Sequence, residues 1–234
     1  MKYKSLAIAL TYIKQGETSI ISKILTKEKG LQTFIIKGVR SKKSKKKLSF
    51  FEPLSLLNID AKYNNTKAIQ FIEELTVAKK FNYNSEKMHR KFIAFFVAEI
   101  NGKVLQVNEQ NNSLFNFIWD ISEELFTCKE IDSNFAIRYL LNLSKHLGFY
   151  PSLDTFKNPF FNLESGSFSE KNDSLKIFID AQKTIYLKSI IQKINVVIPR
   201  KIKSELLRDL LKYYKINNYN LDSITSHLVI ESLR

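Results

Sequence analysis

The chain has 234 residues, of which 44% are hydrophobic and 12% aromatic, and it carries a formal net charge of +14. This composition excludes a disordered or collagen-like chain, and the length suffices for one large domain or two to three small ones. Cys128 is the only cysteine, which excludes an internal disulfide and a zinc site built from cysteines, so a reducing cytoplasm is the expected location.

The N-terminal part of the sequence is typical of short β-strands. Turn signals at Gly16, Gly30 and residues 64–65 separate β-prone runs. The predicted strands are residues 6–13, 19–26, 31–36, 54–60 and 67–73. Five short strands of even spacing favour a closed or nearly closed barrel of the OB type, with an SH3-like barrel as the alternative.

Beyond about residue 77 the hydrophobic period becomes helical. Helices are predicted at residues 85–106, at 112–125 with a cap at Asn112 or Ser113, and at 133–147 with a cap at Ser133. Gly148 and Pro151 end the third of these helices.

The rest of the chain is less regular at first. We predict a small hairpin or loop within residues 159–182, and residues 175–194 are ambiguous, with a helix favoured for their later half. Pro199 fits the first turn of a helix running to about Tyr214, and a short helix is expected at 223–233. The predicted fold is α+β, with an OB-type barrel domain at residues 1–78 and a helical bundle at 79–234 that includes a small irregular lobe at about 152–182.

Catalytic and metal-binding patterns are weak in this sequence. It contains neither a Gly-x-x-x-x-Gly-Lys-Ser/Thr loop nor a Gly-x-Gly-x-x-Gly loop. His89, His146 and His227 are far apart and lack metal-ligand spacing. We therefore expect no enzymatic activity, no cofactor and no metal. No apolar run approaches the ~18 residues of a membrane span, so we also expect no membrane partner.

Positive charge is concentrated near the N-terminus. Residues 1–47 contain thirteen lysines and arginines against two acids, a net +11 of the +14 in the whole chain. The densest run, KGVRSKKSKKK at residues 37–47, has seven cations and no acid, and it follows the predicted strand 31–36. Such a run can be merely solvated. A cationic loop beside a barrel strand nevertheless favours a polyanion partner, because Lys and Arg contacts to phosphates release counterions.

Three aromatic residues on or near the predicted strands are candidates for stacking on bases. They are Tyr12, Phe34 and Tyr63. Packing in the core is the alternative for each of them.

One set of motifs is specific in combination. It comprises KQGE at 14–17, TKEKG at 26–30, FIIKGVRS at 34–41 followed by the basic run and FEPL at 51–54, GFYP at 148–151 and LRDLLKYY at 207–214. In these motifs the sequence resembles the bacterial RecO family of recombination mediators, and the resemblance covers nearly the whole chain.

The resemblance implies an N-terminal OB fold, a central helical domain and, in many members, a four-cysteine zinc module after the Gly-Phe-x-Pro motif. This sequence has no cysteine there but keeps Leu163, Gly166 and Phe168 at the family's spacing. We therefore predict that the lobe persists without metal and is stabilised by its phenylalanines.

The resemblance also implies a function. RecO proteins bind single- and double-stranded DNA, anneal complementary strands and help load RecA onto strands coated by the single-stranded-DNA-binding protein, with RecR and possibly RecF. The match to the family's Lys-Gly-x-Arg places DNA contacts on Lys37 and Arg40. Charge alone adds Lys14, Lys42, Lys43, Lys45, Lys46 and Lys47. A groove for the acidic C-terminal tail of the single-stranded-DNA-binding protein is expected near Arg138, Lys145 and Phe149, and a nucleoid-associated location follows.

Two other functions fit the same charge pattern. One is an RNA- or ribosome-associated OB-fold protein, and the other is a protein-interaction scaffold with an incidental lysine loop. Annealing of complementary DNA strands separates the mediator from both.

Overall fold

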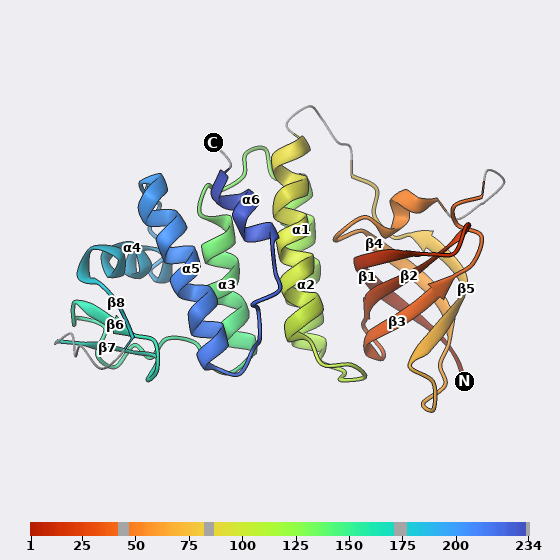
Figure 1. The fold of residues 1–234 in the computed structure, drawn as a ribbon, viewed down its shortest axis with the longest axis horizontal. Helices are drawn as coiled ribbons and strands as arrows, with labels where there is room; N and C mark the ends of the chain where they lie inside the picture. The colour runs from red at the N-terminus through yellow and green to blue at the C-terminus, as the bar shows by residue number, and fades with distance from the viewer. Residues whose placement is uncertain (42–46, 82–86, 171–176, 233–234) are drawn as a thin grey trace. The chain divides into compact units, whose positions relative to one another are not determined.

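A computed structural model gives the fold of the chain and describes residues 1–41, 47–81, 87–170 and 177–232. The chain forms two compact units, Met1–Glu130 and Ile131–Arg234. Figure 1 shows the elements of each unit. Among the described residues, no helix is both long enough and apolar enough to cross a membrane. The unit boundary lies after Glu130, and the domain boundary at residue 78 stays a prediction.

A closed five-stranded barrel begins the first unit. Its strands are β1 Lys2–Gln15, β2 Ser19–Thr26, β3 Gly30–Ile36, β4 Leu56–Lys62 and β5 Ile69–Val77. Their order is β1-β2-β3-β5-β4, with β4 pairing back onto β1 and with β3 and β5 parallel. Alternate residues such as Ile20, Ile24 and Phe34 point inward and are buried. This topology confirms the predicted OB-type barrel.

One 3₁₀ turn and two α-helices complete the described part of the first unit. They are the 3₁₀ turn η1 Leu48–Phe51 and the helices α1 Lys87–Val104 and α2 Asn112–Thr127. Asn111 caps α2 by accepting a hydrogen bond from the Leu114 amide, so the cap lies just before the two predicted positions. Arg90 of α1 donates to the carbonyl oxygens of Leu125 at 2.6 Å and Cys128 at 2.8 Å. Its guanidinium thereby satisfies free carbonyls at the C-terminal end of α2.

The loop between α1 and α2 is docked on the start of β3. The Asn108 amide donates to the Leu31 carbonyl at 3.2 Å, and the Gln32 side chain donates to Asn108 Oδ1 at 2.8 Å. Gly30 has φ +64°, and a Cβ atom there would lie 2.0 Å from the Glu109 carbonyl oxygen. Glycine is therefore required at this position both by its dihedral angle and by the close approach of the loop.

The second unit combines helices with a small sheet. Its elements are α3 Phe135–His146, β6 Phe160–Asn162, β7 Ser167–Ser169, β8 Phe178–Ile179, α4 Ala181–Ile191, α5 Arg200–Ile216 and α6 Ser226–Ser232. Gly148 takes φ +86° just after α3, where the sequence predicts the helix to end. In the ambiguous segment, Asp180 caps α4 by accepting from the Lys183 amide, so β8 comes first and the helix follows.

The small lobe is a three-stranded sheet, β7-β6-β8, packed on aromatic rings. Phe161 is fully buried, and its ring centroid lies 5.1 Å from that of Phe168 and 5.5 Å from that of Tyr213. Tyr213 donates to the Phe149 carbonyl at 2.6 Å, and burial raises the pKa of Tyr213 to about 12. Among the described residues, no group of three or more His, Cys, Asp or Glu side chains could hold a metal. The described residues of the lobe therefore do not fit the four-cysteine zinc module that the resemblance implies for many family members, and the buried rings of Phe161 and Phe168 lie in its interior.

Candidate nucleic-acid interface

Strand register brings three of the predicted cations to one end of the barrel. Lys14 on β1 pairs with Ile20 on β2, which pairs with Ile36 on β3, and Lys37 follows directly. The Arg40 amide donates to the Thr18 carbonyl at 2.9 Å, and its guanidinium donates to the Gly16 carbonyl at 3.0 Å. Arg40 is thus held against the turn between β1 and β2, which follows Lys14 closely in the chain. We call Lys14, Lys37 and Arg40 the cationic end.

The remaining predicted cations follow in the basic run. Lys47 is exposed just before η1, and its carbonyl accepts a hydrogen bond from the Phe50 amide. Lys42, Lys43, Lys45 and Lys46 lie outside the described residues.

The side chains of the cationic end keep their charge available. No described carboxylate lies within ion-pair distance of Lys14 or Lys37. Lys62, farther along the barrel, differs because it pairs with Glu73 at 2.5 Å, and Lys2 pairs with the same carboxylate at 2.8 Å. The hydrogen bonds from Lys2 and Lys62 lower the pKa of Glu73, so its carboxylate stays ionised and offsets part of the charge of the two lysines.

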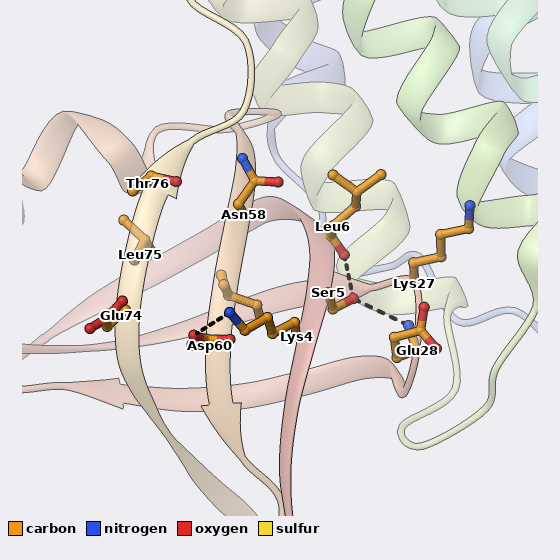
Figure 2. A pocket seen from close by; sticks show the side chains of 11 residues that line it. Lys4, Ser5, Leu6, Lys27, Glu28, Asn58, Asp60, Glu74, Leu75 and Thr76 are labelled. Carbon is orange, nitrogen blue, oxygen red and sulfur yellow. Dashed lines mark hydrogen bonds and ion pairs between the residues drawn. The ribbon is translucent and has the colours of Figure 1, made fainter.

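Another part of the barrel surface has mixed charge. An open groove of about 520 Å³ lies over β1, β4 and β5, where register places Lys4, Asp60 and Glu74 in one row (Figure 2). The Lys4 ammonium lies 3.5 Å from the Asp60 carboxylate, and Glu28 adds a third acid beside Lys27. A polyanion gains little from a surface on which carboxylates offset the lysines.

An apolar row crosses the outer surface of the barrel beside the cationic end. Cross-strand pairing connects Ile13, Ile21, Ile35 and Phe71, one residue each from β1, β2, β3 and β5. Ile13 is 63% exposed and Phe71 is 43% exposed. The Lys37 ammonium lies 5.9 Å from the centre of the Phe71 ring. We call these four residues the outer row.

The predicted stacking aromatics have different environments. Phe34 is fully buried in the barrel core, so core packing, the alternative named for it, holds and Phe34 is not a stacking platform. Tyr12 is half-buried against the same core, and Tyr63 is half-buried with the Lys29 ammonium 5.3 Å from its ring centre. Sequence reasoning missed Phe71. Its position between the inward-facing Gln70 and Ile72 is the period-two signal that could have identified it.

The residues predicted for a partner's tail lie on or just after α3. Arg138 Nε lies 3.1 Å from Asp132, and its guanidinium is 5.0 Å from the Phe135 ring centre. Lys145 is exposed in the last turn of the helix. The Phe149 ring packs edge-on against Tyr214 at 4.8 Å. Arg138 and Phe149 are therefore already engaged within the unit, and a binding role for the three residues stays a prediction.

Comparison with known proteins identifies relatives of this chain. The family described as "Recombination protein O N terminal" matches residues 1–81. The "DNA repair protein RecO" of Flavobacterium johnsoniae is 30% identical over 92% of this chain and 91% of its own length. The chain belongs to the RecO family.

Further RecO relatives extend the match over the whole chain. The "DNA repair protein RecO" of Flavobacterium psychrophilum is 28% identical over 100% of this chain and 98% of its own length. The protein of that name from Christiangramia forsetii is 32% identical over 70% of the chain. This RecO family member thus aligns with its relatives through both units, including the lobe without cysteines.

Proposed function

We propose that this chain is a DNA repair and recombination mediator that binds single- and double-stranded DNA through the cationic end of its barrel. The observation that carries the proposal is the convergence of Lys14, Lys37 and Arg40 at one end of an OB-type barrel, with the Lys47 end of the basic run following. Membership of the RecO family supports the same function.

Annealing of complementary strands is the activity that this geometry suits. Two strands repel one another through their phosphates, and lysine and arginine contacts to phosphates reduce that repulsion without reading sequence. Because such contacts leave the base edges free, a bound strand can still pair with its complement. The protein thus acts by binding, and no bond-breaking step or cofactor is invoked.

The proposed partners follow from the family. They are RecR, possibly RecF, and the C-terminal tail of the single-stranded-DNA-binding protein. RecA would be loaded onto DNA strands that this binding protein coats. The proposed location is the cytoplasm, on the nucleoid.

The salt dependence of DNA binding tests the cationic end directly. Replacing Lys14 and Lys37 with glutamine is expected to reduce the slope of log affinity against log salt for single-stranded DNA by about 1.4, because each phosphate contact contributes about 0.7. The matched control replaces Lys4 and Lys27 with glutamine, which removes the same charge from the mixed groove. Fluorescence anisotropy titrations over a salt series measure both slopes.

Equal slope changes in the two variants would contradict DNA binding at the cationic end and would indicate a general effect of net charge. A competition titration with structured RNA addresses the second candidate function. A strong preference of the wild-type protein for that RNA would favour an RNA- or ribosome-associated role.

A further inference from the structure

The outer row is an unusual feature for the water-facing side of a barrel. Outward positions of a half-buried sheet are commonly polar, yet Ile13, Ile21, Ile35 and Phe71 all point outward. Because directly paired residues on neighbouring strands have Cβ atoms about 5 Å apart, the four side chains form one continuous apolar strip. Continuous apolar strips on a protein surface commonly mark a binding site.

Phe71 gives the strip the chemistry of a base platform. Its ring is 43% exposed, and it has a partly buried isoleucine, Ile35, beside it on β3. The Lys37 ammonium lies 5.9 Å from the ring centre, within reach of a phosphate attached to a base on that ring. An exposed cation–π contact is weaker than stacking of a base on an aromatic ring, so an arriving base can displace the lysine from the ring face.

We propose that the outer row binds the unpaired bases of single-stranded nucleic acid, with one base stacked on Phe71 and neighbouring bases on the isoleucines. The inference rests on the proposed DNA-binding function and assigns the outer row to one of its substrates. The strand then runs across β1, β2, β3 and β5, with its phosphates toward the cationic end.

The consequence is a division of labour between the two surfaces. In a duplex the base faces are covered by neighbouring base pairs, so a duplex offers phosphates and groove edges but no ring to stack on Phe71. Duplex binding therefore depends on the cationic end alone. Single-strand binding depends on both the cationic end and the outer row.

Substitutions at Phe71 test this division. We expect Phe71→Ala to weaken binding of an oligo-dT of about 20 nucleotides about 10-fold or more, and to change the affinity for a duplex of the same length less than about twofold. Phe71→Trp is expected to retain single-strand binding, whereas Phe71→Leu, which keeps an apolar side chain without a π-face, is expected to lose it. Ile185→Ala is the control, because Ile185 is 63% exposed but lies on α4 in the second unit.

A spectroscopic readout separates stacking from a general loss of structure. In Phe71→Trp, oligo-dT is expected to quench fluorescence more than it quenches the wild-type protein, whose single tryptophan is Trp119 on α2. Thermal unfolding followed by circular dichroism verifies that each variant is folded.

The outcomes distinguish this inference from the proposed function. Suppose that the wild type binds DNA and that Phe71→Ala binds oligo-dT equally tightly. The outer row is then not the platform, and the proposed function stands. Equal weakening toward single strands and duplex also overturns the inference. If the wild type binds neither DNA, both this inference and the proposed function fail.

Discussion

Replacing Gly30 with alanine is expected to lower the free energy of unfolding of the first unit by about 3 kcal/mol or more. Two effects add at this position. An alanine must adopt φ +64°, and its Cβ atom must avoid the Glu109 carbonyl oxygen, which lies 2.0 Å from the ideal Cβ position. Relief of that clash requires movement of the α1–α2 loop, with loss of its hydrogen bonds to Leu31 and Gln32.

Gly16→Ala is the matched control for the Gly30 prediction. Gly16 has φ +58°, but no atom lies within 4 Å of an added Cβ, so only the backbone strain of about 1–2 kcal/mol applies. Urea unfolding followed by Trp119 fluorescence measures both variants, since Trp119 lies in the first unit. Equal losses in the two variants would show that the docked loop is not constrained by Gly30.

Replacing Phe161 with alanine is expected to lower the free energy of unfolding of the second unit by about 3–5 kcal/mol. The Phe161 side chain is fully buried between the Phe168 and Tyr213 rings, so its removal leaves a cavity inside the lobe. Phe160 on the same strand is half-buried, and Phe160→Ala is expected to cost about 1 kcal/mol. Unfolding followed by circular dichroism measures the difference.

The same lobe predicts insensitivity to metal. Added zinc or a chelator is expected to leave the unfolding midpoint unchanged, because ring packing rather than coordination stabilises the sheet. Zinc present at one equivalent in the purified protein would contradict this account.

Much of the barrel could be predicted from the sequence, because hydrophobic alternation and turn glycines are local signals. Residues 19–26 form β2 with the predicted bounds. β1 begins at Lys2 rather than at residue 6, because Lys2, Tyr3 and Lys4 pair with β4, and that pairing is not local. α4 begins at Ala181 because Asp180 caps it, which the ambiguous hydrophobic pattern did not reveal.

The candidate interface was only partly accessible to sequence reasoning. Charge identified Lys14, and the family resemblance identified Lys37 and Arg40, but the convergence of the three depends on strand register. Aromatic character alone did not separate Phe34 from Phe71, since inward and outward positions alternate and the absolute phase is set by packing. The outer row requires the parallel pairing of β3 with β5, which no local pattern predicts.

Strand annealing tests the central claim most directly. The measurement is the rate at which complementary strands coated with the cognate single-stranded-DNA-binding protein form duplex, with the wild type and a variant carrying serine at Lys42, Lys43, Lys45, Lys46 and Lys47 side by side. The wild type is expected to accelerate annealing well above the spontaneous rate, and the variant is expected to be slower because five phosphate-binding charges are lost. Annealing by the wild type at the spontaneous rate would contradict the mediator function, and equal rates for the two proteins would remove the basic run from the DNA-binding surface.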